Sequence, residues 1–233
     1  MKKIGILIFI LALMVGVVFS SFFSFGKVET SNLFKFNFSR GVKGSGNVVT
    51  EQRQVSDFTG IDVGGIFNVE ATAGREYSVS VEADDNLLPL IKTEVRRGVL
   101  EISTEGRIKS SSKITVRVTA PSLDSVEASG VARVDLNGVS NGALKLKSSG
   151  ASKVIAAGEA TELSAKTSGA STVDAESLRA TDATVKTSGA STVRVTVSGR
   201  LVASASGAGK VLYGGTPANV EKRTSGAGKV AEF

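Results

Sequence analysis

The 233-residue sequence contains no cysteine, no histidine and no tryptophan, and it has only three prolines. Without cysteine there is no disulfide framework, no thiol nucleophile and no thioether lipid anchor. Without histidine, the usual zinc and copper sites and the Ser-His catalytic arrangements lose their commonest member. The sequence therefore argues against the common metalloenzyme and hydrolase classes, and we expect no metal, no cofactor and no enzyme activity.

Aromatic residues are also scarce in most of the chain. Beyond Thr59 the only phenylalanines are Phe67 and Phe233. A core in that part of the chain must be filled by Val, Ile, Leu and Ala, which favours thin, layered packing. The formal net charge is +6, and Lys2 and Lys3 supply two of these charges. The remaining excess fits a soluble surface as well as an anionic partner, and we expect no nucleic-acid partner.

The N-terminus carries an export or membrane signal. Lys2 and Lys3 precede an uncharged run over residues 4–25. As a helix, these 22 residues would be about 33 Å long, enough to cross a hydrocarbon core of about 30 Å. Residues 1–26 are therefore a membrane anchor or, if they are cleaved, a signal peptide, and the membrane is a partner through residues 4–25 in the first case.

Residues 27–46 form a polar and basic linker between this segment and the rest of the chain. Within the linker, Phe34, Phe36 and Phe38 alternate with polar residues. A period of two predicts a short strand, although an aromatic patch at a membrane interface would have the same pattern.

An internal repeat decides the fold. A Ser-Gly pair recurs six times with spacings of 20, 19, 20, 18 and 19 residues between the glycines. The six pairs are Ser129-Gly130, Ser149-Gly150, Ser168-Gly169, Ser188-Gly189, Ser206-Gly207 and Ser225-Gly226. The period is too short for two helices and a turn, so each repeat is expected to be one β coil.

The residues around each Ser-Gly pair alternate as strands do. Apolar residues occupy most positions four and six residues before the glycine, and polar residues lie between them. Valine always stands four residues after the glycine: Val134, Val154, Val173, Val193, Val211 and Val230. Each coil is therefore a half-buried strand, a Ser-Gly corner and a second strand that begins near this valine.

Coils that repeat without reversal stack in parallel, about 4.8 Å apart, so that six of them make a rod of roughly 29 Å. Glycine suits a corner that needs positive φ or a close backbone approach. The serine before it can form a hydroxyl ladder along the rod. We therefore predict an all-β, single-stranded parallel β-helix over residues 121–233, with coils of 18–20 residues.

Residues 47–120 form a second β region in front of the repeats. Strands are expected in Gly65–Ala71, Tyr77–Val81, Val99–Ser103 and Lys113–Val118, and a short helix or turn between Asp84 and Ile91. This region could cap the open N-terminal edge of the solenoid, which would otherwise invite aggregation between strands.

From about Gly44 to the C-terminus, the chain resembles the bacterial family named "putative auto-transporter adhesin, head GIN domain". The likeness rests on the segments Gly44–Asn47, Phe58–Val63, Val99–Ile102 and Ala120–Leu123, followed by the Ser-Gly repeats. The resemblance implies a right-handed parallel β-helix outside the cytoplasm, in the periplasm or at the cell surface. It brings no catalytic residues.

Basic residues stack in two outward columns of the predicted coils and are the candidate site for an anion or a glycan. Lys147, Lys166 and Lys186 share the first column, and Arg133, Lys153, Lys210 and Lys229 share the second. Stacked like charges cost stability, so one interpretation is that they bind a repetitive anion such as an envelope polysaccharide. The alternative is that the long side chains extend into water and oppose aggregation.

Acidic residues could in principle serve a metal or an acid-base reaction. Asp84 and Asp85 stand beside Asn86, where a solvated turn is the alternative to a metal site. Asp135 and Asp174 share one column of the repeat. The known chemistry of β-helix enzymes on polysaccharides requires carboxylates or basic groups gathered on one face, and this pattern is weak here.

Together these features predict a non-catalytic, exported cell-envelope protein, either membrane-anchored or secreted, that serves adhesion or envelope interactions with a glycan or protein partner. The alternative is a polyanion- or glycan-binding module that uses the basic columns. A polysaccharide-active β-helix enzyme is the third hypothesis. The sequence is also compatible with a homo-oligomer.

Overall fold

The computed structural model describes residues 41–110 and 112–233. The expected N-terminal hydrophobic helix and the strand expected at Phe34–Phe38 lie outside these residues. In the described part the chain is all β, apart from one turn of 3-10 helix, η1 (Leu88–Leu90). No helix in these ranges has the length and hydrophobicity needed to cross a membrane.

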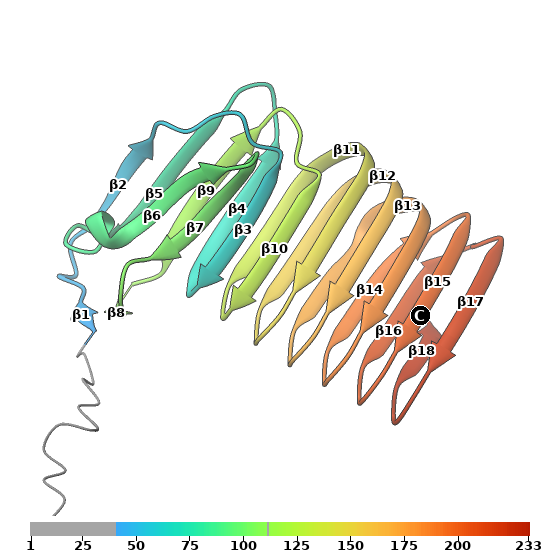
Figure 1. Ribbon diagram of the computed structural model, residues 1–233. Coiled ribbons are helices and arrows are strands. Elements are labelled where there is room, and N and C mark those ends of the chain that lie inside the picture. Colours follow the sequence, from blue (N-terminus) through green and yellow to red (C-terminus); the bar gives the residue numbers. More distant parts are fainter. Residues whose placement is uncertain (1–40, 111) are drawn as a thin grey trace, which may run out of the picture. The chain divides into compact units, whose positions relative to one another are not determined.

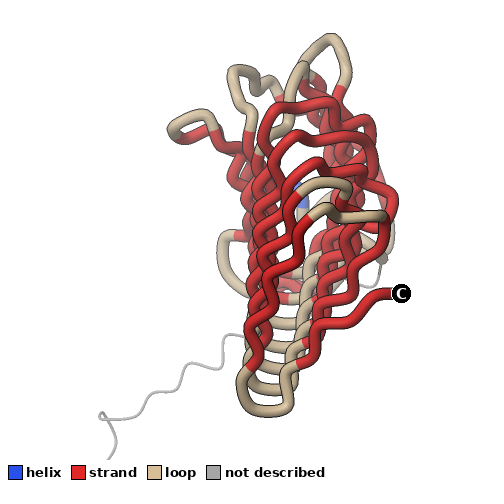
Figure 2. Tube along the Cα trace, turned by 90° about the vertical axis from the view of Figure 1, so that its right-hand side faces the viewer, coloured by secondary structure: helices blue, strands red, loops and turns tan. Residues whose placement is uncertain are grey.

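The repeats form a β-solenoid with two walls of parallel strands (Figure 1). Its strands are β10 (Ser125–Gly130), β11 (Arg133–Ser148), β12 (Lys153–Thr167), β13 (Thr172–Thr187), β14 (Thr192–Val197), β15 (Arg200–Ala205), β16 (Lys210–Gly215), β17 (Asn219–Thr224) and β18 (Lys229–Glu232). Figure 2, which looks along the stack, shows the two walls joined by loops. The predicted solenoid is confirmed.

The long strands β11, β12 and β13 contribute to both walls, because their pairing shifts register midway along each strand. We define wall A as β10, the second halves of β11–β13, β15 and β17. Wall B consists of the first halves of β11–β13, β14, β16 and β18. Within each wall every strand pairs in parallel with the next coil.

The core is a set of stacked apolar columns between the walls. The predicted valine column is completely buried from Val134 to Val211, while Val230 in the last coil is only partly buried. Opposite it, wall A contributes Val126, Leu146, Ala165 and Val185. Small and branched side chains fill this thin interior, as the shortage of aromatic residues predicted.

The stack continues into the N-terminal region, which the repeat itself did not reveal. Strands β3 (Gly60–Gly65) and β4 (Phe67–Ala73) pair in parallel with β10 and β11, so they form one more coil. Strands β7 (Val99–Thr104) and β9 (Ile114–Ala120) pair in parallel with β3 and β4. These two strands lie outside the β3–β4 coil, although they follow it in the chain.

Antiparallel strands flank this end of the stack. Strand β6 (Ile91–Arg96) pairs with β7, while β5 (Ser78–Asp84) pairs with β9 and with β2 (Val48–Arg53). Strands β1 (Val42–Lys43) and β8 (Ile108–Lys109) form a separate small sheet. The strands expected between residues 65 and 118 and the short helix or turn expected between Asp84 and Ile91 are found.

The Ser-Gly corners need glycine for two reasons. All six corner glycines have φ between 66° and 75°, which a residue with a Cβ rarely adopts. A Cβ on Gly169 would also lie 2.7 Å from the carbonyl oxygen of Gly150 in the preceding coil. The corners can therefore stack closely only if each of them is glycine.

A buried hydroxyl ladder runs inside the corner, but it is not made by the serines of the Ser-Gly pairs. Those serines are half-exposed or exposed, and Ser129 and Ser206 donate to carbonyl groups of the preceding coil at 3.3 Å. The buried hydroxyls lie two residues before and after the glycines: Ser148, Ser152, Thr167, Ser171, Thr187 and Ser191. Contacts such as Ser148 Oγ to Ser152 Oγ at 2.8 Å join them.

The last coil places charged residues in the inward columns. Lys222 occupies the position held by Val185 and Ala203 in the coils before it, and its ammonium nitrogen lies 4.8 Å from the centre of the Tyr213 ring. Glu232 follows Tyr213 in the corresponding column of wall B. The open C-terminal edge is therefore less apolar than the interior of the stack.

Candidate functional site

One outward column of wall A contains eight charged residues. It continues on β3, β7 and β6, which extend the same sheet beyond β10 and are counted with wall A from here on. The alternation of the strands points every second residue outward, and the parallel register places equivalent residues side by side. The column runs through Glu94, Glu101, Asp62, Glu127, Lys147, Lys166, Lys186, Ser204 and Arg223, on β6, β7, β3, β10, β11, β12, β13, β15 and β17. We call it the charged column.

The charged column changes sign in the middle. Glu101, Asp62 and Glu127 form its acidic half, and Lys147, Lys166 and Lys186 form its basic half. At the junction, the ammonium group of Lys147 contacts the Glu127 carboxylate at 2.8 Å. Within the described ranges, no carboxylate lies within 4.0 Å of Lys166 or Lys186.

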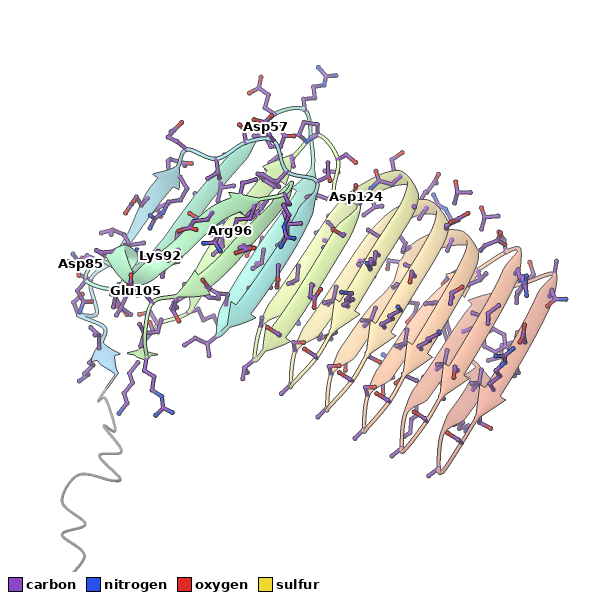
Figure 3. All side chains as sticks on the ribbon, viewed as in Figure 1. Asp57, Asp85, Lys92, Arg96, Glu105 and Asp124 are labelled. Carbon is purple, nitrogen blue, oxygen red and sulfur yellow. The ribbon has the colours of Figure 1, made fainter. Side chains whose placement is uncertain are left out.

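Arg96, which is labelled in Figure 3, is the last residue of β6 and lies beside the acidic half. Its guanidinium lies 2.8 Å from Glu94 and 3.6 Å from Glu101. These contacts leave Asp62 and Glu127 without an arginine partner in the described part of the chain. The acidic half therefore keeps a net negative charge.

Asp62 lies in the middle of the acidic half. Partial burial raises the pKa of its carboxyl group above the usual value, and the negative charges of Glu127 and Glu101 raise it further. Lys147 acts in the opposite direction. The position of Asp62 is thus electrostatically unfavourable for a carboxylate when the chain is considered alone.

Two shallow grooves lie along the charged column. The larger, of 840 Å³, follows the basic half and is lined by charged residues that include Lys145, Lys166, Lys186, Arg200, Glu162 and Asp182. The smaller, of 290 Å³, follows the acidic half beside Arg96 and Arg97. Small residues such as Gly60, Ser125 and Ser164 occupy the neighbouring outward column and leave space next to the longer side chains.

The second predicted basic column lies on wall B and is interrupted. In register, Arg133 and Lys153 are followed by Thr172 and Thr192 before Lys210 and Lys229 continue the column. The guanidinium of Arg133 also contacts Asp135 of its own strand at 2.8 Å. The structure therefore brings these four basic residues together only in two pairs.

The acidic groups considered in the sequence have structural partners. Asp84 is buried and accepts hydrogen bonds from the Gly46 backbone at 3.0 Å and from the Ser110 hydroxyl at 2.8 Å. Asp85 accepts from Ser45 and Asn47, which lowers the pKa of its carboxyl group. These bonds attach residues 44–47 to the turn after β5, and a Cβ on Gly44 would collide with Asp84.

Asp135 and Asp174 do share a column, as predicted, but Ile155 lies between them. The carboxylates therefore stand two coils apart, a backbone separation of about 9.6 Å. Across the described residues, no group of three or more acidic, histidine or cysteine side chains is arranged to hold a metal ion.

The acidic half of the charged column could not be found from the repeat. Glu127 stands three residues before Gly130, as Lys147 does before Gly150, and so belongs to the repeat. Asp62 and Glu101 join the column only because β3 and β7 stack out of chain order. No sequence period connects these residues, since 65 positions separate Asp62 from Glu127.

The chain belongs to the family described as "Putative auto-transporter adhesin, head GIN domain", whose model matches residues 57–217. This confirms the resemblance noted in the sequence. No curated protein matches the chain.

Solved structures share the fold. A "putative adhesin" from Bacteroides fragilis superposes with a TM-score of 0.69 at 22% identity, covering 83% of this chain and all of the other. A "putative adhesin" from Parabacteroides merdae gives 0.56 at 20% identity, covering 83% of this chain and 99% of the other. A "Putative lipid binding protein" from Parabacteroides distasonis gives 0.53 at 16% identity, covering 83% and 100%.

Proposed function

We propose that this chain is a non-catalytic, exported cell-envelope protein that serves as an adhesin-like interaction scaffold. The observation that supports this proposal most is wall A, where a regular parallel sheet displays one continuous charged column beside shallow grooves. Rigid, repetitive faces of this kind suit binding to extended partners. Membership of the head GIN family also supports a role at the cell surface.

The proposal places the solenoid outside the cytoplasm, held at a membrane through residues 4–25 or secreted. In accordance with the family resemblance, the solenoid is proposed to be right-handed. Both features follow from the sequence expectations above.

The location can be tested with the full chain carrying a C-terminal epitope tag, expressed in a bacterial host. External protease added to intact cells or spheroplasts should remove the tag, while a cytoplasmic marker protein stays intact. A tag that remains protected until the inner membrane is lysed would contradict an extracytoplasmic solenoid.

Lack of catalysis can be tested by incubating the purified full chain with a panel of envelope polysaccharides. We expect no increase in reducing ends and no unsaturated products. Sustained release of either from one polymer, lost when the outward residues of wall A are changed, would overturn the non-catalytic proposal.

The second candidate function is binding of an anionic glycan along the basic half of the charged column. It is supported by the groove beside Lys145, Lys166 and Lys186, whose neighbouring Ser and Thr side chains offer hydrogen bonds. The backbone positions of Lys147, Lys166 and Lys186 repeat about every 4.8 Å, and such a row of positive charge attracts an extended polyanion.

A matched pair of variants tests this candidate. The double variant Lys166→Glu, Lys186→Glu changes the basic half, while Lys153→Glu, Lys210→Glu makes the same charge change on wall B. Anionic polysaccharide binding at low salt should fall at least tenfold only in the first variant. Equal losses in both variants would indicate an effect of net charge rather than a site.

A further inference from the structure

The order of charges along the charged column makes it complementary to itself. Three acidic residues on β7, β3 and β10 are followed by three lysines on β11, β12 and β13, and the sign changes between Glu127 and Lys147. Reversing the direction of the rod exchanges the two halves. An identical column that runs the opposite way therefore presents a lysine opposite each acid.

A twofold axis that lies between two facing copies of wall A, along the strand direction, produces this reversal. If the axis passes between β10 and β11, it places Glu127 opposite the Lys147 of a second copy. The same rotation brings Asp62 opposite Lys166 and Glu101 opposite Lys186, giving six such pairs over the whole interface. A parallel arrangement would instead place lysine opposite lysine and is electrostatically unfavourable.

We propose that wall A is a self-association surface, on which a second copy of this chain docks antiparallel through the charged column. The occupant is argued from charge complementarity, since each half supplies what the other lacks. Within the described ranges, Lys166 and Lys186 have no carboxylate partner and Asp62 has no basic partner, whereas Glu127 contacts Lys147 at 2.8 Å and Glu101 contacts Arg96 at 3.6 Å.

The residues beside the charged column allow two walls to approach. In the neighbouring outward column, the rotation brings Gly60 opposite Ser164 and Ser125 opposite Lys145. On the other side, the rotation brings Ser129 opposite Ser149 and Gly64 opposite Ser168. Apart from Lys145, these flanking side chains are short, so the charged column is the ridge at which contact is made.

Repulsion between the stacked like charges of the monomer would also favour association. Neighbouring carboxylates and neighbouring lysines stand about 4.8 Å apart on adjacent strands, an arrangement that is destabilising in an isolated sheet. Burial together with the charges of Glu127 and Glu101 raises the pKa of Asp62. An ammonium group from a second copy would favour the charged form of Asp62 and reduce both repulsions.

This inference does not depend on what the scaffold adheres to, but a polyanion and a second copy would compete for the same lysines. Two charge-reversal variants distinguish binding of a polyanion from binding of a second copy. The variant Lys166→Glu, Lys186→Glu removes the basic half, and the variant Asp62→Lys, Glu101→Lys removes the acidic half.

The first experiment measures association of the full chain in detergent micelles by sedimentation at low salt. Each double variant alone should dimerise at least tenfold more weakly than the parent chain. An equimolar mixture of the two variants should recover a heterodimer, because the altered halves complement each other. Circular dichroism confirms that each variant is folded.

The second experiment uses the absence of cysteine in the chain. Ser129→Cys lies beside the proposed axis, whereas Ser206→Cys occupies the same outward column farther along the rod. Two copies of Ser129→Cys would be separated by about 5 Å along the rod, but two copies of Ser206→Cys by about 34 Å. A bis-maleimide with a span of about 12 Å should therefore cross-link the first variant and not the second.

The outcomes decide between the occupants. Recovery of a heterodimer with cross-linking confined to Ser129→Cys supports the antiparallel dimer. A parent chain that stays monomeric at high micromolar concentration, or equal cross-linking of both cysteine variants, overturns it. Association only after a polyanion such as heparin is added, unaffected by Asp62→Lys, Glu101→Lys, also overturns it and assigns the lysines to the glycan.

Discussion

Replacement of a corner glycine tests the physical account of the stack most directly. Gly169 has φ of 75°, and an added Cβ would lie 2.7 Å from the Gly150 carbonyl oxygen and 3.1 Å from the Gly150 backbone nitrogen. Both neighbours are backbone atoms of the preceding coil, so they can move only if the coil itself moves. Gly169→Ala should therefore be strongly destabilising.

Two matched variants separate the causes. Gly98 also has φ of 75° but has no atom within 4 Å of an added Cβ, so Gly98→Ala reports the backbone strain alone. Gly142→Ala has neither a positive φ nor a close neighbour and serves as the control.

The expected magnitudes follow from these differences. The positive φ costs alanine about 1–2 kcal/mol, and the loss of unfolded-state entropy returns about 0.4–1 kcal/mol. Crowding against a packed neighbour adds about 1–3 kcal/mol. We expect Gly142→Ala to be neutral or slightly stabilising, Gly98→Ala to cost about 1 kcal/mol, and Gly169→Ala to cost about 2–4 kcal/mol.

Urea unfolding of the three variants, followed by far-ultraviolet circular dichroism, measures these costs as changes in the free energy of unfolding. A Gly169→Ala variant no less stable than Gly98→Ala would refute the argument. It would mean that the coils can separate at the corner without cost and that glycine is needed there only for its dihedral angle.

Three further predictions concern the interior, the turn after β5 and the C-terminal edge. Ser171→Ala should lower the free energy of unfolding by about 1 kcal/mol, because the buried Ser171 hydroxyl donates to the Ser148 and Ser168 carbonyls at 3.0 and 2.9 Å. Ser149→Ala, which changes a half-exposed serine, is the control in the same unfolding assay. An equal loss of stability in both variants would argue against the ladder. Hydrogen bonds from Ser45 and Asn47 lower the Asp85 pKa, so its contribution to stability is complete above the unfolded-state value of about 4 and is lost as the pH falls through the folded-state value. Asp85→Ala should thus be destabilising at pH 7 and nearly neutral at pH 2, and a loss independent of pH would contradict this cause. Lys222→Val should promote end-to-end association seen by light scattering, whereas the outward Lys229→Val should not.

Much of the solenoid could be predicted because its repeat is local. The valine column from Val134 to Val230 and the Ser-Gly corners each follow from one period of the chain, and the structure places them as expected. The Lys147, Lys166 and Lys186 column was predictable for the same reason, since equal spacing in sequence becomes adjacency in a parallel stack.

The remaining features depend on pairings that no local pattern encodes. Strand β7 follows β3 in the chain but lies on its outer side, so Glu101 precedes Asp62 in the column. The sequence analysis expects the ladder at the serines of the Ser-Gly pairs instead. Ser148 and Ser171 stand in phase with the inward Leu146 and Val173, but their polar residue type does not indicate burial. Their burial arises from the tightness of the corner, which brings backbone carbonyl groups within reach of short hydroxyl side chains.

The strands at the N-terminal end of the solenoid do not stack in chain order, unlike the coils that follow them. The β3–β4 coil pairs with β7 and β9, which follow it in the chain, whereas each later coil pairs with a coil that precedes it. Insertion or loss of one whole repeat between β10 and β17 would change the length of the rod while leaving its foundation untouched. The solenoid is in this sense a spacer, in which the number of coils sets the distance between its first and last coils.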